Sequence, residues 1–584
     1  MLNLSRSMVS TRRASSLALW LSLSGALASA CGSNGSATGG GPSAGTGGSG
    51  GSSSSSNVPS GSTTTGDTGP SVGASVGGST PQGPFTDFPA APILDTPMGG
   101  AAPPADAATL FGDAGSGDPT GGPCMAEPSP GTLYPNNWLR PRFRWSAPQS
   151  QNLFEIRIKS ANEINDLVVY TTATSWKMPA DMWQQLSLHM QDQPLTVTVR
   201  GATLTGGKLT GKPAVGTSGD IRIAPADASG SIVYWRTIKA TNSGELKGFA
   251  VGDESVVSAL PSSAVKVKIK DTPVTCIGCH TSTPDGKYAA FKTLGVIDGG
   301  ALGSVAPEST GQPPPFWTKT SMDAMADSAF GVPTFSKAHW ADGDYTIITS
   351  WGKGHDAKLI WFDLQANASG EGKSFGYIAR DGDARGVVMP AWSHDGNTIA
   401  YISTDDSTDG RPSVAQTDIF TVPYAAKKGG AAKGIPGASD PAYNEYYPSL
   451  SPDDKLVAFN RIPAGTNTYN QPLAEVFVIP TAGGTATRLD ANDPPACSGE
   501  KSPGLTNSWP KWAPASVTVG DRTFYWLTFS SDRGGGTPQL YVTAVVVQGD
   551  KVTTYPALYL WNQPDNEANH TPAWDVFDIP PVVK

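Results

Sequence analysis

Two cysteines and a histidine stand close together near the middle of the chain, in the run Cys276-Ile-Gly-Cys279-His280. Two thiols separated by two residues can bond to one edge of a porphyrin, and the adjacent imidazole then falls under its centre. The spacing predicts covalent attachment of one c-type haem through Cys276 and Cys279, with His280 as a ligand of the iron. A Cys276–Cys279 disulfide, a zinc half-site and a chance pair beside an exposed histidine are the alternatives. A complete zinc site is disfavoured because the chain has no second pair of cysteines or histidines at ligand spacing.

Strands must position this motif, because the sequence around it repeats a strand, turn and strand pattern about every 50–60 residues. A proline leads through an aromatic or apolar residue into a turn and then an apolar strand. Five copies begin at Pro333, Pro390, Pro448, Pro510 and Pro572. A sixth copy, Thr283-Pro-Asp-Gly286, lacks the leading proline. One such sheet cannot bury both of its faces alone, so regular repetition predicts blades packed radially around an axis.

These repeats resemble the TolB-type or WD40-like (PD40) propeller repeats of bacterial envelope proteins. The resemblance implies an all-β fold in which residues 229–584 form a six-bladed β-propeller. The last copy, ending near Trp574, has no room for its outer strands. The apolar run Ile232–Ile238 at the start of the region is therefore expected to complete that blade and close the ring.

Alignment of the repeats places the cysteine motif within a blade. When Asp285-Gly286 is matched to Asp395-Gly396, His280 falls on the position of Pro390 and Cys279 on that of Met389. In TolB-like propellers this stretch enters the innermost strand, so a haem there would lie over the mouth of the central channel.

Two residues near equivalent positions could supply a distal iron ligand. They are Met389, immediately before Pro390, and His570, two residues before Pro572. Met322 and Met325 are weaker candidates. Core packing of Met389 and a solvated turn position for His570 are the alternatives.

Composition sets the class of protein. The 584 residues include 41 basic and 50 acidic side chains, a net charge of −9, and no basic run longer than Arg12-Arg13, which disfavours nucleic-acid binding. Glycine and proline are abundant, at 68 and 50 residues, while only 16% of residues are charged. This composition favours an all-β protein.

The N-terminal region is predicted to be an export signal followed by a tether. Residues 1–30 have the basic, apolar and small-residue order of a secretory signal. Cys31 directly after small residues resembles a bacterial lipoprotein signal, which implies lipidation of Cys31 and a membrane anchor; cleavage after Ala28 or Ala30 without a lipid is the alternative. Residues 31–120 are predicted to form a disordered Gly/Ser/Pro-rich linker. The expected location is the bacterial cell envelope, as an outer-membrane-anchored lipoprotein or in the periplasm.

A small β-sandwich is predicted for residues 121–228. Phe154–Lys159 and Leu195–Arg200 alternate apolar and polar residues, and three shorter runs add strands at Phe143–Trp145, Leu167–Tyr170 and Ile221–Ile223. Their pattern resembles a fibronectin type III module. Cys124 in this part and Cys497 in the propeller could pair in an oxidising compartment and pin the two parts together.

Two functions follow from these patterns. One is a single-haem redox lipoprotein with a redox or envelope protein partner, in which the propeller holds haem c. The other is a haem-free propeller module that binds a protein or peptide. No G-x-S-x-G elbow or convincing Ser-His-Asp arrangement indicates a hydrolase. Asp381-Gly-Asp383 and Asp405-Asp406 could bind calcium or act as acids, although solvated loop carboxylates are the simpler interpretation.

Overall fold

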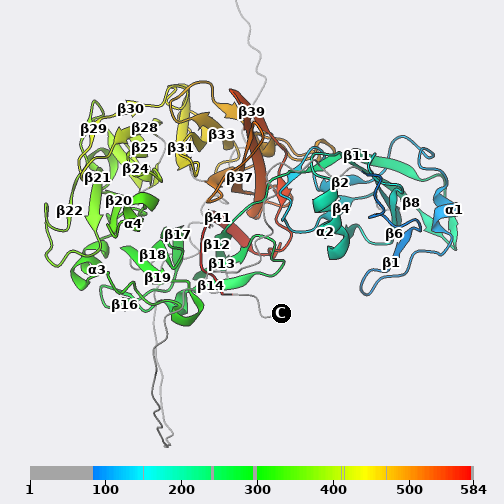
Figure 1. Ribbon diagram of the computed structural model, residues 1–584, viewed down its shortest axis with the longest axis horizontal. Coiled ribbons are helices and arrows are strands. Elements are labelled where there is room, and N and C mark those ends of the chain that lie inside the picture. Colours follow the sequence, from blue (N-terminus) through cyan, green and yellow to red (C-terminus); the bar gives the residue numbers. More distant parts are fainter. Residues whose placement is uncertain are drawn as a thin grey trace, which may run out of the picture.

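The structure is a computed structural model in which two parts of the chain are rich in strands, a smaller part ending near residue 228 and a larger ring of sheets after it (Figure 1). No helix among the described residues has the length and apolar character that a membrane span needs. The signal segment, Cys31 and the first part of the predicted linker lie outside the described residues. The structure describes residues 83–148, 150–238, 243–293, 299–408, 411–412, 415–468 and 470–580.

The smaller part contains two sheets that share one core. The larger sheet has the strand order β1 (Ile93–Asp95), β6 (Leu167–Thr171), β5 (Leu153–Lys159), β8 (Leu195–Ala202), β11 (Ala214–Ile223) and β3 (Leu133–Tyr134). The smaller sheet has the order β2 (Cys124–Glu127), β4 (Arg142–Ser146) and β7 (Ser175–Lys177). Trp145 of β4 and Phe154 of β5 join the sheets with ring centroids 5.4 Å apart. The five strands predicted from sequence in this part are therefore confirmed.

Two features of this part differ from the sequence-based prediction. Residues 83–120, assigned to a disordered linker, contain β1 and the helix α1 (Ala107–Phe111). Phe88 and Phe111 are each only 1% exposed, so this segment buries enough apolar surface to order. A second helix, α2 (Ala180–His189), was also not predicted; it buries Trp183 and Leu186. A short hairpin joins β9 (Leu204–Thr205) to β10 (Lys208–Leu209).

The larger part consists of antiparallel sheets that follow one another around an axis (Figure 1). Two sheets have three strands, β17–β19 (Ile277–Ser282, Tyr288–Thr293, Gly299–Ser304) and β20–β22 (Thr346–Trp351, Lys358–Asp363, Phe375–Tyr377). Two have four strands, β24-β25-β28-β30 (Gly386–Trp392, Thr398–Thr404, Thr417–Pro423, Lys433–Gly434) and β31–β34 (Tyr443–Leu450, Leu456–Pro463, Glu475–Pro480, Thr487–Arg488).

Two further sheets lie where this ring meets the smaller part. One contains β35 (Asn507–Trp512), β37 (Arg522–Ser531), β38 (Gln539–Gln548) and β39 (Lys551–Thr554), with β36 (Val517–Val519) and β40 (Leu558–Tyr559) beside them. The other has the order β14 (Val257–Pro261), β13 (Ser243–Ala250), β12 (Ser231–Ile238) and β41 (Ala568–Asp575). The larger part also contains three two-stranded ladders and two short helices: β15–β16 (Lys268–Ile269, Thr272–Pro273), β23–β29 (Arg380–Asp381, Gly430–Ala431), β26–β27 (Ser407–Thr408, Arg411–Pro412), α3 (Lys319–Met325) and α4 (Lys337–Ala341).

The last sheet joins the beginning of the ring to its end. Strand β12 pairs antiparallel with β41, and Trp235 lies opposite His570 across the ladder. This is the pairing predicted for the run Ile232–Ile238. Because the two strands are more than 300 residues apart in sequence, their ladder makes the arrangement of the sheets a closed unit rather than an open stack.

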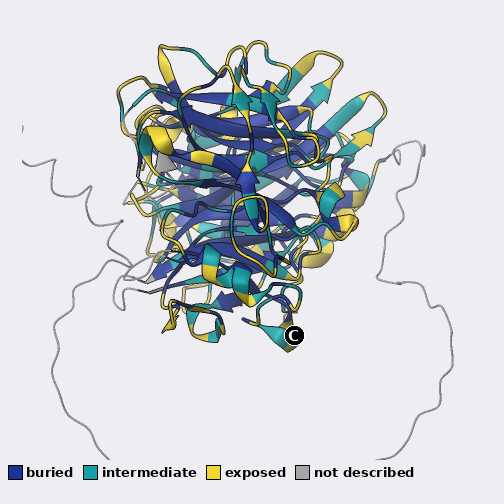
Figure 2. Cartoon of the chain, turned by 90° about the vertical axis from the view of Figure 1, so that its left-hand side faces the viewer, coloured by how far each residue is buried: buried dark blue, intermediate teal, exposed yellow. Residues whose placement is uncertain are grey.

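The repeated turn motif folds by the same local hydrogen bonds in three sheets. Its Ser or Thr hydroxyl donates to the Asp carboxylate two residues later, at 2.6 Å from Thr283 to Asp285 and from Ser393 to Asp395, and at 2.7 Å from Ser451 to Asp453. The next residue has a left-handed backbone, with φ of 74° at Gly286, 79° at Gly396 and 59° at Asp454. These turns reverse each innermost strand onto the next one. As Figure 2 shows, the strands of the ring are mainly buried and the exposed residues concentrate in loops.

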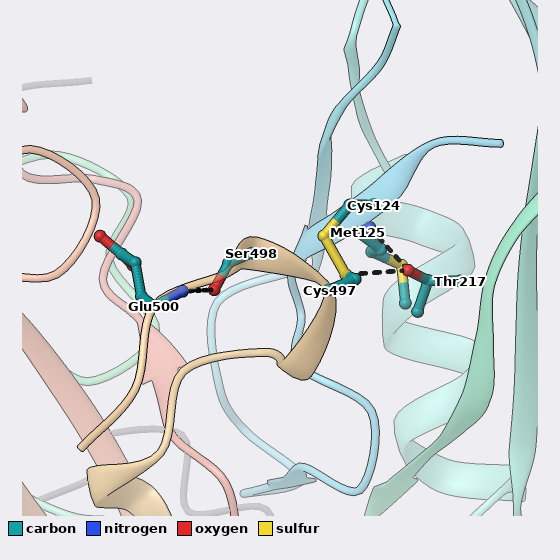
Figure 3. The surroundings of a disulfide bond; sticks show 6 residues. All are labelled: Cys124, Met125, Thr217, Cys497, Ser498 and Glu500. Carbon is teal, nitrogen blue, oxygen red and sulfur yellow. Dashed lines mark hydrogen bonds between the residues drawn. A yellow bond between two sulfur atoms is a disulfide. The ribbon is translucent and has the colours of Figure 1, made fainter. Parts of the chain in front are cut away.

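A disulfide ties the smaller part to the ring. Cys497, in the short turn Ala496–Ser498, is bonded to Cys124 of β2, and the Thr217 hydroxyl lies 3.3 Å from the Cys497 sulfur (Figure 3). The sequence suggested this pair without being able to show that the residues are close. Polar contacts add to the junction, including the Arg522–Asp192 ion pair at 2.6 Å.

Candidate functional site

A cavity of about 90 Å³ lies where the innermost strands of the sheets converge. The proline of each repeat reaches it, and so does His280 at the place where the sixth repeat lacks a proline. The alignment of His280 with Pro390, and of Cys279 with Met389, is therefore confirmed. The cavity is lined by Cys279, His280, Thr281, Val332, Pro333, Thr334, Met389, Pro390, Ala391, Tyr447, Pro448, Trp509, Pro510, Lys511, Thr571 and Pro572.

The repeated proline explains the shape of the innermost strands. Proline lacks an N–H and cannot complete a ladder, so it favours a bulge in a strand. Register shifts occur at this position in β24, β31, β35 and β41. The residue before the proline has a positive φ in each case, namely 47° at Met389, 56° at Tyr447, 63° at Trp509 and 46° at Thr571. The bulge thus gives each of these strands one extra residue at the cavity.

The predicted haem-attachment residues do not share one environment. Cys276 is 1% exposed and belongs to an apolar core between sheets. Cys279 and Met389 are half-buried and line the cavity. His280 also lines the cavity, with only 6% of its surface exposed, and its Nε2 donates to the Val233 carbonyl oxygen at 3.1 Å.

His570 lies beside this cavity rather than in it. It lines a smaller neighbouring cavity of about 30 Å³, together with Ser508, Trp509, Ser530 and others. Its ring packs against Trp235 with centroids 4.4 Å apart. The register shows that Thr571, and not His570, is the equivalent of Met389, because Thr571 is the residue with positive φ before the proline.

Both histidines are neutral at pH 7. Burial lowers the pKa of His280 to about 4, although the hydrogen bond to Val233 favours the charged form. Burial also lowers the pKa of His570 to about 4, and the nearby His280 adds to the effect. Because the Val233 carbonyl can only accept, the proton of neutral His280 lies on Nε2, and Nδ1 is an acceptor.

Lys511 is a functional candidate that the sequence analysis missed. It follows Pro510 in β35 and lines the cavity, half-buried. Burial lowers the pKa of Lys511, while the Cys279 sulfur and the Asp575 carboxylate oppose that shift. Its place in the repeat, one residue after the leading proline of its own copy, was a signal that could have identified it, since Ala391 holds the equivalent position without a charge.

Two buried polar atoms at the cavity lack hydrogen-bond partners within the described part of the chain. They are Nδ1 of His280 and the hydroxyl of Thr571, a residue that is 6% exposed. Buried polar groups in proteins are almost always paired, so such atoms at a cavity indicate a place where a bound molecule could supply the partner.

A covalent haem does not fit this arrangement. Attachment needs both thiols on one side of the porphyrin with the imidazole below it, yet Cys276 packs in the core while Cys279 faces the cavity. His280 already uses Nε2 for the Val233 carbonyl. The cavity, at about 90 Å³, is also smaller than the roughly 300–1,000 Å³ of typical organic-ligand pockets.

The other side chains that could bind a metal are packed in the core or paired with neighbouring side chains. Met325 is buried in the core, and Met322 packs against the same core. The Asp383 carboxylate accepts hydrogen bonds from Tyr401 and Ser403 and pairs with Arg380. The Asp405 carboxylate lies 2.7 Å from Nδ1 of the exposed His355 ring. Over the ranges that the structure describes, no three His, Cys, Asp or Glu side chains are grouped so as to hold a metal ion.

Comparisons with known proteins found solved structures of low similarity to this chain. No protein-family model and no curated protein matches the chain. A solved structure described as TolB from Agrobacterium tumefaciens is 15% identical, covers 59% of this chain and 98% of its own, and gives a TM-score of 0.30. Hydrazine synthase from Kuenenia stuttgartiensis is 15% identical, with coverage of 50% and 71% and a TM-score of 0.27. The Swd1 β-propeller domain from Myceliophteria thermophila is 10% identical, with coverage of 50% and 88% and a TM-score of 0.23. Because these identities and TM-scores are low, the description of the fold rests on the strand pairing and the shared cavity of this chain.

Proposed function

We propose that this chain is an exported β-propeller protein that binds a segment of a partner protein in its central channel. The observation that carries the proposal is the convergence of equivalent positions from successive sheets on one cavity whose buried polar atoms lack partners among the described residues. A rigid ring of strands holds those positions in place, which suits recognition more than chemistry that needs a moving lid.

The proposal includes a finer assignment of the fold. We infer that the sheets of the larger part are the six blades of one propeller, closed by the ladder between β12 and β41. We also infer that the smaller part is a fibronectin III-like sandwich, because a three-stranded sheet, β2-β4-β7, faces a sheet with the order β6-β5-β8-β11. The sandwich then acts as a spacer between the N-terminal segment and the propeller.

The proposed location is the bacterial cell envelope. The support is the signal-like sequence before Cys31 and the Gly/Ser-rich stretch after it. A lipid on Cys31 would tether the sandwich and propeller to a membrane while leaving them in the aqueous space beside it. The disulfide between Cys124 and Cys497 agrees with an oxidising compartment.

Filling the cavity tests the binding function. Peptides from a random display library are selected on the immobilised protein, and their affinities are measured by calorimetry. Ala391→Trp places an indole in the cavity and should abolish binding of the selected peptides. The matched control, Ala425→Trp, lies on an exposed turn of the same sheet and should leave affinity unchanged. Selected peptides that bind both variants equally would show that the channel is not the binding site.

Haem c is a second candidate, favoured by the sequence Cys276-Ile-Gly-Cys279-His280 alone. It would require Cys276 to leave the core in which it packs. Expression of the full chain with a cytochrome c maturation system, followed by a pyridine haemochrome assay, decides between the two functions. One covalent haem per chain would replace the binding proposal with a redox one. Absence of haem, in cells where a control cytochrome matures, would remove this candidate.

A further inference from the structure

We propose that the central cavity binds the carboxylate end of a protein chain, with Lys511 as the charge that pairs with it. The inference rests on the proposed function, because it names the part of the partner that enters the channel. The proposal adds a chemical requirement to the binding site: the partner must present a free C-terminal carboxylate on a small last residue.

The first argument is charge. Across the described residues, Lys511 makes no ion pair or hydrogen bond, although it lines an interior cavity. An unpaired charge held away from water is costly, and proteins normally pair it or remove it. The Cys279 sulfur and the Asp575 carboxylate favour the charged form of Lys511, whereas burial opposes it. A carboxylate entering the cavity would supply the missing partner in an environment where water screens little.

The second argument is the set of donors and acceptors around that charge. His280 offers an acceptor, Nδ1, and Thr571 offers a hydroxyl that can donate or accept. The last residue of a protein chain carries a carboxylate and, one bond away from its α-carbon, its own N–H. The carboxylate matches Lys511 and Thr571, while the N–H matches His280. A bare inorganic anion would leave the His280 acceptor without a donor.

The third argument is size and wall chemistry. The cavity, of about 90 Å³, is small, which suits the end of one chain and excludes a folded surface. The prolines of the repeats form much of the wall, and Trp509 stacks on Tyr447 with ring centroids 3.9 Å apart. These rigid, mainly apolar walls hold a small terminal residue without needing to reorganise.

The positive charge also argues against a competing occupant. Cys279 and Met389 bring two sulfur atoms to the cavity, which is a donor set that soft metal ions prefer. A bound cation would face the Lys511 ammonium group, and the two charges would repel. The cavity is therefore better matched to an anionic group than to a metal ion.

The experiment compares two versions of one peptide on the full exported protein. A fluorescein-labelled peptide, GSGSGSA, is made with a free C-terminal acid and with a C-terminal amide, and binding is followed by fluorescence anisotropy. The acid should bind, and the amide should bind roughly tenfold or more weakly, because it has lost the charge. Sodium acetate, as a small free carboxylate, should compete far less well than unlabelled peptide acid.

Variants assign the effect to Lys511. Lys511→Met should weaken binding of the acid by roughly tenfold or more and leave binding of the amide unchanged, while Lys511→Arg should restore most of the acid preference. The matched control is Lys551→Met, at an exposed lysine on β39. The comparison of acid with amide on the unaltered protein needs no variant, so it stands even if Lys511→Met folds poorly.

Each outcome decides one of the claims. Equal affinity for acid and amide would overturn the inference. Acetate that competes as well as the peptide acid would replace the chain terminus with a free small carboxylate, and would also overturn it. If neither peptide binds while display-selected peptides still lose affinity in Ala391→Trp, the channel remains the binding site and only the carboxylate requirement is wrong.

Discussion

Buried polar groups are paired at the junction between the two parts of the molecule, whereas several of those in the central channel are not. At the junction, the indole N–H groups of Trp526, Trp561 and Trp574 donate to the carbonyl oxygens of Asp227, Arg140 and Ser229 at 2.8–2.9 Å. In the channel, Lys511 has no ion pair among the described residues, and Nδ1 of His280 and the Thr571 hydroxyl have no hydrogen-bond partner there.

The paired groups of the junction stabilise the fold, whereas the unpaired groups of the channel are available for binding. A buried polar group with a partner adds to stability, whereas one without a partner lowers it. Buried groups without partners occur elsewhere in the fold too, for example Trp145 Nε1 and Tyr234 OH, but those of the channel lie at a cavity that a bound molecule can enter. Substitutions at the junction should lower the free energy of unfolding, and substitutions in the channel should leave it unchanged or raise it.

The largest expected effect is at Trp574 in the junction. Its ring lies 5.7 Å from that of Trp138, and it is only 4% exposed. Trp574→Ala should lower the free energy of unfolding by about 3–5 kcal/mol, because it leaves a cavity in the core that both parts share. Urea unfolding followed by fluorescence and circular dichroism measures the change. Trp574→Phe, which keeps a ring but loses the N–H, should cost less; an equal loss in both variants would show that the hydrogen bond, not packing, dominates.

The disulfide should have the next largest effect. It closes a loop of 373 residues, so its removal increases the freedom of the unfolded chain. The double variant Cys124→Ser, Cys497→Ser should lose about 2–5 kcal/mol of stability, seen as a lower urea midpoint and melting temperature. Peptide affinity in the channel should not change, because the cavity is lined by other strands. A matching loss of affinity would show that the junction and the channel are coupled.

Acid should destabilise the fold through the two buried histidines, which lie at the channel and beside it. His280 and His570 have pKa values of about 4 in the folded chain, below the ordinary value of 6.5. Between pH 6.5 and pH 4 the unfolded chain therefore binds protons that the folded chain does not. The stabilising contribution of the two histidines should be complete above pH 6.5 and should fall as pH is lowered, by about 1.4 kcal/mol per pH unit for each histidine. The buried carboxyls of Glu163, Glu445 and Asp575, with pKa values raised to about 7, 7 and 6, act in the opposite direction over this range.

Urea unfolding at a series of pH values measures this dependence. The double variant His280→Gln, His570→Gln should lose the histidine part of the slope between pH 6.5 and pH 4, so its free energy of unfolding should fall less on acidification than that of the unaltered protein. The control His355→Gln, at an exposed histidine, should retain it. An unchanged slope in the double variant would mean that other groups cause the acid sensitivity.

Much of the ring could be predicted from the sequence because its signal is repeated. The spacing of Pro390, Pro448 and Pro510 located equivalent strands, and matching the turns of the repeats placed His280 at a proline position, where the cavity now contains it. The strand Ile232–Ile238 was identified because the final repeat lacked outer strands. A pattern that recurs several times at even spacing is stronger evidence for a strand than one short pattern alone.

The remaining features depend on information that a local pattern does not contain. Cys276 and Cys279 were interpreted together because of their spacing, but Cys276 precedes β17 and packs in the core, whereas Cys279 lies at the register shift within β17 and lines the cavity. Ordering of residues 83–120 depends on a few aromatic residues such as Phe88 and Phe111, which the composition of the whole linker concealed. Contact between Cys124 and Cys497 follows only from the folded arrangement of both parts.

The smallest expected effect is the sharpest test of the difference between the two regions, because it should have the opposite sign. Lys511→Met removes a charge that burial disfavours and replaces it with a flexible apolar chain of similar length. Because no ion pair among the described residues is lost, the free energy of unfolding should rise, by about 0.5–2 kcal/mol, while affinity for a peptide acid falls. Differential scanning calorimetry and anisotropy on the same samples measure both quantities. A variant that loses stability together with affinity would place Lys511 among the residues that hold the ring together, and the channel would then resemble the junction after all.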